Sequence, residues 1–291
     1  MAKFAYTDNF LKNLSTAYQR QIEDKIVSMG VPSTIMEERL DRWFMNFGDL
    51  EEKEVALKIF LEIYYFNEHK IENLLSAYRT KINQYLIDKG KDFTDIIVVK
   101  PDGKADSANS HAYKLSKEWN LPRKVFLNAS DVTIENSYGK ILLFFNDTHG
   151  SGNQFIREFS YLIKQVGDSN CFILCFAFAR KALVAFRKEF PNITIVPELP
   201  TPTIHEKNIF TPQQLQIIKS LGDQVYPLHP LGYGDCGLLV AYHFQCPNNN
   251  LPIVWANGDN NSFYNSEGQK KDGYPWFPLF SYKPKPKVKM P

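Results

Sequence analysis

After residue 92, short apolar segments alternate with segments of helical periodicity, and this alternation restricts the fold more than any other feature of the sequence. We expect strands at the apolar segments IIVV (96–99), KVFL (124–127), ILLFF (141–145), CFILCFAF (171–178), ITIV (193–196), LLVAYHF (238–244) and PIVW (252–255). Helices are expected near 107–119, 152–166, 179–189 and 211–221. Strands that are apolar throughout are buried on both faces, so the sequence predicts an α/β fold with a mostly parallel sheet between layers of helices.

Before residue 92, apolar residues recur at helical spacing, in one series over 57–64 and a second over 71–85. We therefore expect three parts: an all-helical N-terminal region (1–92), the α/β domain (93–282) and a basic, Pro-rich tail (283–291).

The composition is that of a globular protein, with 44% hydrophobic and 23% charged residues. A formal net charge of +2 provides no strong field for nucleic acid. The basic run KPKPKVK is expected as a solvated tail, and the alternative is a phosphate-binding arm. The cysteines lack a CxxC pair and the histidines lack ligand spacing, which predicts no metal site built by the chain. Neither a signal sequence nor an apolar stretch of ~20 residues is present, so we expect a cytoplasmic protein without a membrane span.

The stretch KILLFFNDTHGSGNQFIREF (140–159) combines a strand end, a glycine-containing loop and the start of a helix. Ligands of parallel sheets bind at the carboxyl ends of the strands. An apolar stripe from Phe155 to Val166 defines the helix well. The loop HGSGN therefore presents free backbone N–H groups at a helix N-terminus, where a phosphate would fit.

The residues around this loop narrow the choice of phosphate ligand. A Walker A loop is excluded, because it needs Gly-Lys-Ser/Thr where this chain has Gly152-Asn153-Gln154. A dinucleotide fingerprint is excluded too, because it needs a third glycine where Phe155 stands. The acid instead precedes the loop, as Asp147 at the strand end. Its carboxylate can accept hydrogen bonds from two vicinal hydroxyls while the loop holds a phosphate one sugar length away, which suits a ribose 5-phosphate.

This arrangement resembles the phosphoribosyl-pyrophosphate signature of type I phosphoribosyltransferases, whose fold is a Rossmann-like parallel sheet. Asn146 and Asp147 stand at its acidic pair, which holds the ribose hydroxyls and is the catalytic position. Asn146 replaces the first acid, so the resemblance implies sugar-phosphate binding more strongly than catalytic competence. It also implies that the ribose phosphate is held by the residues of the phosphate loop: Thr148, His149, Gly150, Ser151, Gly152, Asn153 and Gln154.

A second resemblance involves HPLGYGDCGLLVAYHFQCPNNNLPIVWA (229–256) and YPWFPLF (274–280). Both are similar to the C-terminal part of phosphoribosyltransferase-like proteins of bacterial conflict systems. Those proteins are encoded beside partners such as reverse transcriptases of retron type, with their msDNA, or ATPases. The resemblance implies an antiviral defence effector that a protein partner from the same operon holds in check.

Two further places are candidates for the rest of a phosphoribosyl site. In IIVVKPDGKADSANSHAYKL (96–115), Lys104 and a helix capped by Asp106 or Ser107 could contact a pyrophosphate, and the alternative is a surface turn with a solvated lysine. Mg²⁺ bridging the sugar hydroxyls and the pyrophosphate would neutralise the leaving group. In GYGDCG (232–237), Tyr233 could stack on a base and Asp235 could bond it, although a glycine-rich turn before a strand explains the same residues.

Two classes of function remain open. One is an enzyme that transfers or hydrolyses a phosphoribosyl group, making or splitting the glycosidic bond of a nucleotide, with His149 as either a proton carrier or a residue that fills the loop. The other is a catalytically inactive fold that senses a nucleotide or phosphoribosyl pyrophosphate, or docks on a partner through its N-terminal helices. Asn146 favours the second class, whereas the loop and Asp147 favour a retained ligand in both.

Overall fold

The computed structural model describes residues 6–102, 106–206, 209–257 and 276–280, with side chains from Ala112 onwards in the helix that begins at Asp106. The chain divides into two compact units. We call Glu68–Thr201 the sheet unit, and Met1–Asn67 together with Pro202–Pro291 the terminal unit. The chain therefore leaves the terminal unit once and returns to it, and each unit is described separately.

The sheet unit contains a five-stranded sheet in the order β3-β2-β4-β6-β8. Its strands are β2 (Ile96–Lys100), β3 (Phe126–Asn128), β4 (Ile141–Phe145), β6 (Cys171–Leu174) and β8 (Thr194–Val196). Every neighbouring pair is parallel, and all residues of β4 and β6 are buried, as their apolar sequences require. The predicted fold class, a mostly parallel α/β sheet with helices before it, is confirmed.

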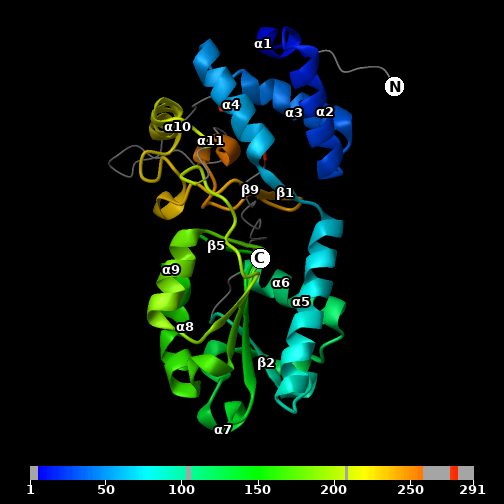
Figure 1. Cartoon of the computed structure of the whole chain (residues 1–291), viewed down its shortest axis with the longest axis vertical. Coiled ribbons are helices and arrows are strands. Elements are labelled where there is room, and N and C mark those ends of the chain that lie inside the picture. The colour runs from blue at the N-terminus through cyan, green and yellow to red at the C-terminus, as the bar shows by residue number, and fades with distance from the viewer. Residues whose placement is uncertain (1–5, 103–105, 207–208, 258–275, 281–291) are drawn as a thin grey trace, which may run out of the picture. The chain divides into compact units, whose positions relative to one another are not determined.

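Helices cover both faces of this sheet (Figure 1). The helices of the sheet unit are α5 (Glu68–Asp88), α6 (Asp106–Trp119), the single-turn α7 (Ile134–Ser137), α8 (Asn153–Val166) and α9 (Arg180–Glu189). α8 and α9 lie on one face, where Phe155 and Phe186 join Phe144 of β4 in one apolar cluster. α5 and α6 lie on the other, and Trp119 of α6 donates its indole N–H to the Leu75 carbonyl of α5 at 2.8 Å.

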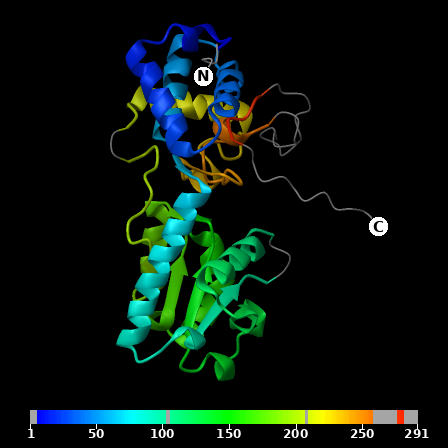
Figure 2. The same cartoon turned by 90° about the vertical axis from the view of Figure 1, so that its right-hand side faces the viewer.

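The helix α5 packs with the sheet although it precedes it in the sequence. The Tyr78 hydroxyl donates to the Cys175 carbonyl at 3.0 Å, just beyond the end of β6. Figure 2 shows α5 running beside the strands of the sheet unit. The boundary expected near residue 92 thus falls inside the sheet unit, between α5 and β2.

Two of the predicted strands continue past a break. After β4, residues 148–149 form β5 (Thr148–His149), and after β6, residues 177–178 form β7 (Ala177–Phe178). β5 and β7 pair in parallel with Thr148 opposite Ala177 and His149 opposite Phe178. This short ladder continues the β4–β6 pair, because the Asn146 amide still donates to the Leu174 carbonyl at 3.0 Å.

The terminal unit is mostly helical. Its elements are α1 (Asn9–Lys12), α2 (Thr16–Met29), α3 (Ser33–Phe44), α4 (Leu50–Glu62), β1 (Tyr64–Phe66), α10 (Pro212–Val225), β9 (Val240–Tyr242) and α11 (Pro252–Trp255). The Asp49 carboxylate accepts the Glu52 amide at 2.8 Å and so caps α4. None of the described helices combines the length and the apolar character that crossing a bilayer requires.

Three expectations for this unit were wrong. Only 240–242 of the segment 238–244 is a strand, and β9 pairs with β1 in a two-stranded sheet instead of completing the large one. The segment 252–255 is the helix α11, since Pro252 at its first turn has a preset φ and needs no hydrogen-bond partner. The expected helical series over 57–64 ends at Glu62, and Tyr64 begins the strand β1 instead.

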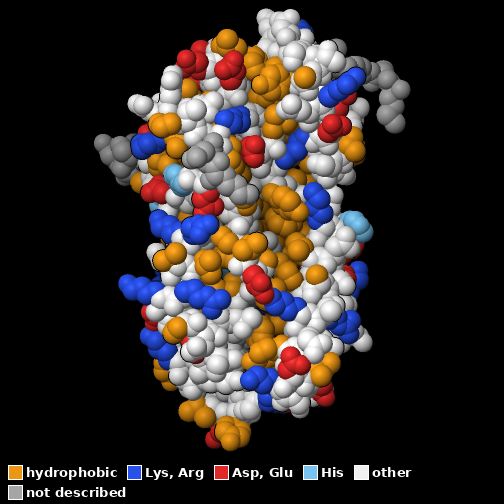
Figure 3. Space-filling model, in the orientation of Figure 1, with side chains coloured by type: hydrophobic (Ala, Val, Ile, Leu, Met, Phe, Trp, Pro, Cys, Tyr) orange, Lys and Arg blue, Asp and Glu red, His pale blue; other side chains and the backbone are white. Residues whose placement is uncertain are grey.

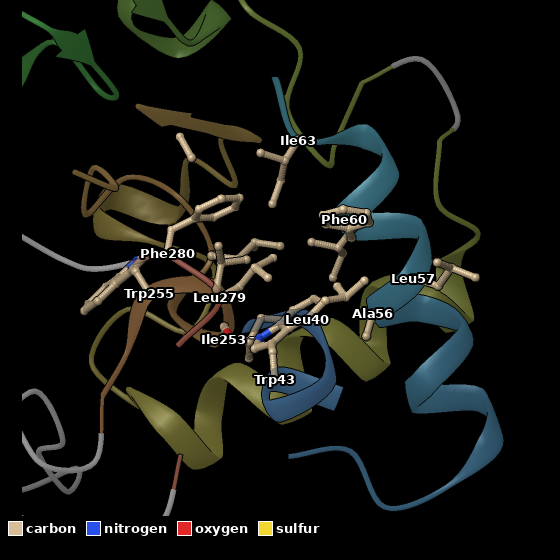
Figure 4. Packing of buried hydrophobic residues seen from close by; sticks show 14 of the residues in the cluster. Leu40, Trp43, Ala56, Leu57, Phe60, Ile63, Ile253, Trp255, Leu279 and Phe280 are labelled. Atoms are coloured by element: carbon tan, nitrogen blue, oxygen red, sulfur yellow. Dashed lines mark hydrogen bonds between the residues drawn. The ribbon is translucent and has the colours of Figure 1, made fainter. Parts of the chain in front are cut away.

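The core of the terminal unit joins segments from both ends of the sequence (Figure 4). Leu40, Trp43 and Phe60 from the N-terminal helices pack with Ile253 of α11 and with the segment 276–280. The indoles of Trp43 and Trp276 both donate to the Ile253 carbonyl, at 2.7 and 3.0 Å. The N-terminal helices therefore cannot complete their core without the C-terminal part of the chain.

Candidate functional site

The strand order of the sheet unit creates a switch point between β2 and β4. From β2 the chain moves to β3 at one edge, and it then returns to β4 on the other side of β2 and continues outward through β6 and β8. The helices that follow β2 and β4 consequently leave on opposite faces. In open parallel sheets, ligands bind outside the carboxyl ends of the strands at such a point. The predicted phosphate loop, which follows β4, lies at this point.

Asn146 and Asp147 directly follow β4, and both side chains bond the local backbone. The Asn146 Oδ1 accepts the Asp147 amide at 2.9 Å, and the Asp147 Oδ1 accepts the Thr148 amide at 2.7 Å. Asp147 is only 8% exposed, and its carbonyl accepts the amides of Phe176 and Ala177 at 3.0 and 3.2 Å. The Asp147 carboxylate, which the sequence suggested for two ribose hydroxyls, therefore already bonds the backbone of its own turn.

Thr148 and His149 are part of the strand β5 and not of an open loop. The His149 ring is 6% exposed and meets the rings of Phe155 and Phe186 edge-on, at centroid distances of 5.4 and 5.3 Å. Its Nε2 is buried, and no described group forms a hydrogen bond with it. Burial lowers the pKa of His149 to about 4, against the opposing effect of the Asp147 carboxylate. A neutral, enclosed imidazole does not match the proton carrier considered from the sequence.

The turn that follows β5 leaves backbone donors without acceptors. Gly152 precedes the first residue of α8 and provides no side-chain cap, while the Asn153 amide has only a long contact of 3.4 Å to the Ser151 Oγ. Within the described residues, no oxygen accepts the backbone amides of Gly150, Ser151, Gly152, Gln154 or Phe155. Amides that point out of a helix N-terminus, together with its dipole, form a site for an anion.

Gly152 is required by packing as well as by its position in this turn. Its φ is +77°, and a Cβ at this position would lie 2.9 Å from Cε1 of the buried Phe186 ring. We expect Gly152→Ala to lower the free energy of unfolding by about 2–3 kcal/mol, the sum of left-handed strain and overpacking. Urea unfolding would measure this loss.

Gly139→Ala is the matched control, because Gly139 has a φ of +69° and its Cβ would meet nothing within 4 Å. Gly139→Ala should lower the free energy of unfolding by about 1 kcal/mol, because it introduces left-handed strain but no clash. Equal losses for the two variants would show that Phe186 does not confine the turn.

The other predicted site residues are divided between the two units. Lys104 lies outside the described residues, and α6 begins at Asp106, so Asp106 and Ser107 are in its first turn. Tyr233 and Asp235 belong to the terminal unit, in the single 3₁₀ turn Tyr233–Asp235. Tyr233 is 48% exposed and its ring lies 4.7 Å from that of His229. The predicted phosphate loop and the predicted base contacts thus belong to separate units.

A comparison of the sequence with models of known protein families identifies the family of this chain. The family model PRTase-CE matches residues 40–281, which is most of the chain and includes parts of both compact units. The chain belongs to the PRTase-CE family. Members of PRTase-CE are phosphoribosyltransferase-like proteins associated with conflict systems, which confirms the coarser part of both resemblances. The comparison with curated proteins found no match, and neither did the comparison with solved structures.

Membership of PRTase-CE raises the question of a metal, because phosphoribosyltransferases often use Mg²⁺ with phosphoribosyl pyrophosphate. In the described part of the chain, no three side chains of His, Cys, Asp or Glu gather as a metal site would need. The side-chain oxygens next to β4 already accept backbone amides. A Mg²⁺ ion bound here would therefore need oxygens of the ligand in addition to those of the described side chains.

Two cationic residues at the same edge of the sheet were not selected from the sequence. Arg180 and Lys181 begin α9, directly after β7, and both are exposed. Their signal is present in the sequence as the pair that follows the expected strand 171–178. The pairing of β5 with β7, which brings this pair next to the phosphate loop, was not predictable.

Proposed function

We propose that this protein is a phosphoribosyltransferase-like effector of a bacterial antiviral conflict system, and that it binds a ligand containing ribose 5-phosphate at the turn after β4. The observation that supports this best is the set of backbone amides at the start of α8 that no described oxygen accepts. The switch-point location and the PRTase-CE membership support the same ligand class.

The proposed contacts follow from the geometry of the turn. The amides from Gly150 to Phe155 hold the 5-phosphate, and the Asp147 carboxylate accepts a ribose hydroxyl in addition to the Thr148 amide. The exposed Asn153 and Gln154 border the same turn. Mg²⁺ would be brought by a pyrophosphate on the ligand and would supply charge neutralisation there.

A catalytically inactive fold that senses a nucleotide is the second candidate. Asn146 carries no charge, and its Oδ1 accepts the Asp147 amide, so it cannot replace the first acid of the phosphoribosyltransferase signature. Incubation with Mg²⁺ and phosphoribosyl pyrophosphate or nucleotides, with detection of released pyrophosphate or free base, separates the two. Turnover supports a transferase or hydrolase, and binding without turnover supports the sensor.

The conflict-system context leads us to propose a protein partner as well. The expected partners are a retron-type reverse transcriptase with its msDNA, or an ATPase from the same operon, acting in the cytoplasm. Co-expression of the chain with its genomic neighbours and purification of the complex tests this proposal. A chain that purifies alone from such a co-expression, at equal levels of all components, would contradict it.

Ligand binding is tested most sharply by placing a negative charge in the turn. Ser151→Asp keeps an acceptor for the Asn153 amide and adds an acid before α8, so the fold should be retained or gain about 0.5–1 kcal/mol. The same carboxylate occupies the anion site, and we expect the affinity for ribose 5-phosphate to fall about 10- to 100-fold, or ~1.4–2.8 kcal/mol. Calorimetric titration measures the affinity and urea unfolding the stability.

The control for charge is Gln165→Glu, which adds the same charge near the other end of α8. It should bind ribose 5-phosphate as the wild type does. If the wild type shows no binding of ribose 5-phosphate or phosphoribosyl pyrophosphate, the proposed function is wrong. Equal binding by Ser151→Asp and the wild type would place the ligand elsewhere.

A further inference from the structure

We propose that the basic segment 281–291 docks on the terminal unit, to which it belongs, along the first turns of α4. This segment, SYKPKPKVKMP, lies outside the described residues, and we call it the tail segment. The surface that receives it consists of two hollows, one apolar and one acidic. The inference concerns a contact within the chain and is independent of the ligand proposed above.

The apolar hollow lies between α1 and the start of α4 and has a volume of about 450 Å³. Phe10, Leu14 and Leu50 provide its apolar side chains, and Leu50 is 62% exposed. The Lys53 ammonium, which also lines this hollow, already pairs with the Asp8 carboxylate at 2.6 Å. An exposed leucine beside an apolar hollow is stabilised when another apolar side chain covers it.

The acidic hollow lies between α4 and α10 and has a volume of about 170 Å³. Glu51 and Glu54 line it together with the apolar Val55 and Ile217. Among the described residues, no Lys or Arg pairs with either glutamate, and Glu51 accepts a long contact of 3.4 Å from the Gln213 amide. Figure 3 shows Asp and Glu side chains at the place where Figure 1 draws the start of α4. A lysine suits such a hollow, since its charged end meets the carboxylates while its aliphatic stem covers apolar surface.

The charge of the tail segment is complementary to that of the N-terminal helices. Residues 6–67 contain eleven Asp or Glu and seven Lys or Arg, whereas the tail segment contains four Lys and no acid. Lys283 and Lys285 each precede a proline, which favours an extended backbone. Alternate residues of an extended chain lie on one side, about 6–7 Å apart. Two glutamates three residues apart on a helix have nearly the same spacing, about 5–6 Å, so successive lysines can match them.

The tail segment also has the length and the order of side chains that the surface requires. Phe280 is held near the end of α4, because its ring stacks on that of Tyr65 at 5.6 Å. A path from there back along α4 meets the acidic hollow first and Leu50 last, and three lysines of the tail segment precede Val288 and Met290. The 13 residues of α4 span about 20 Å. The ten residues that end at Met290 reach up to about 33 Å, which is sufficient.

The proposed contact therefore has two parts. The tail lysines meet Glu51 and Glu54, and Val288 or Met290 covers the hollow beside Leu50. The first part weakens with salt, because the Debye length falls from about 10 Å at 0.1 M to about 3 Å at 1 M. The second part depends on apolar area and persists in salt.

Carbodiimide cross-linking of the full chain tests the contact, because the reagent joins a lysine amine to a carboxylate only where the two meet. Mass spectrometry of the digested chain gives the yield of links from the tail lysines to each acid. The yield for Glu51 and Glu54 should exceed that for Asp24 and Glu38, two exposed acids of the same unit, by at least about fivefold at 0.1 M salt. This preference should decrease at 1 M salt. Equal yields for all four acids would establish a solvated tail and overturn the proposal.

Leu50→Ser and Met45→Ser form the matched pair of variants for the apolar part. Both side chains are 62% exposed, and of the two Leu50 lines the apolar hollow. Leu50→Ser should lower the yield of links to Glu51 and Glu54 about threefold, since it removes apolar area from the contact. Met45→Ser should leave the yield unchanged. Equal yields for the two variants would refute the contact of the tail segment with the apolar hollow.

A mixture of isotope-labelled and unlabelled chains distinguishes docking within one chain from docking between two copies. For docking within one chain, the tail lysines should be linked to acids of chains with the same label. Links that join labelled to unlabelled peptides in equal yield would assign the hollows to the tail segment of a second copy and overturn the proposal.

Discussion

Gly232→Ala is expected to lower the free energy of unfolding of the terminal unit by about 4 kcal/mol, the sum of left-handed strain and a backbone clash. Gly232 has a φ of +86°, and a Cβ would lie 2.5 Å from the Asn249 carbonyl oxygen and 2.6 Å from that of Asn250. These contacts are much shorter than van der Waals distances. The variant therefore tests whether GYGDCG is a structural turn.

The backbone that the new methyl group meets cannot yield easily. Asn250 is fully buried, and its side chain donates to the Val240 carbonyl at 2.7 Å and accepts the Leu251 amide at 2.6 Å. Its own carbonyl accepts the Trp255 indole N–H at 3.1 Å. A shift of this residue would disturb β9 and α11 together, so the strain stays at Gly232.

Urea unfolding followed by tryptophan fluorescence measures the effect, because Trp43, Trp255 and Trp276 all belong to the terminal unit. The control is Gly30→Ala in the same unit, with a φ of +66° and only the end of the Asn67 side chain, at 3.2 Å, near the new Cβ. It should cost about 1 kcal/mol. Similar losses for the two variants would refute the close approach of the backbone at Gly232.

Acid should destabilise the sheet unit through His149. The folded chain has a His149 pKa of about 4 against an ordinary value of 6.5, so between these pH values the unfolded chain binds a proton that the folded chain does not. The contribution of His149 to the free energy of unfolding is fully present above pH 6.5 and is lost as the pH falls to about 4. The loss amounts to about 3 kcal/mol by proton linkage.

The measurement is the difference between wild type and His149→Leu in the free energy of unfolding at pH 7 and at pH 4. Subtraction removes the titration of other groups, and the wild type should lose about 3 kcal/mol more than the variant. His69→Leu, which changes an exposed histidine of the same unit, is the control variant. A His149→Leu variant with the wild-type pH profile would show that the folded chain accepts the proton.

The pattern of apolar residues in the sequence correctly predicted elements that are buried on both faces or along one continuous face. The segments 141–145 and 171–174 are apolar throughout, and they form the buried strands β4 and β6. The stripe from Phe155 onwards correctly predicted α8, because one face of that helix packs on the sheet. The same pattern correctly placed the glycine-containing turn between a strand and the start of α8.

The partners of the elements were not predictable in the same way. The segment 238–244 looks like a central strand, yet β9 pairs with β1, which is remote in sequence and was expected to be helical. α5 reads as part of a helical N-terminal region, but it packs on the sheet. The hydrophobic pattern of a segment indicates how deeply the segment is buried. It does not indicate which other segment packs against it.

The candidate site shows the same division between sequence and structure. The residue types and spacing of Asn146, Asp147 and the glycine-containing turn predicted a ribose phosphate site from the sequence alone, and the PRTase-CE match confirms the phosphoribosyltransferase-like family. Only the tertiary structure decided that Asp147 bonds the Thr148 amide, that His149 is buried, and that Arg180 and Lys181 begin a helix next to the same turn. The local sequence determines which chemical groups a segment carries. Which of these groups are buried, and which lie close together, is decided only when strands that are distant in the chain pair with one another.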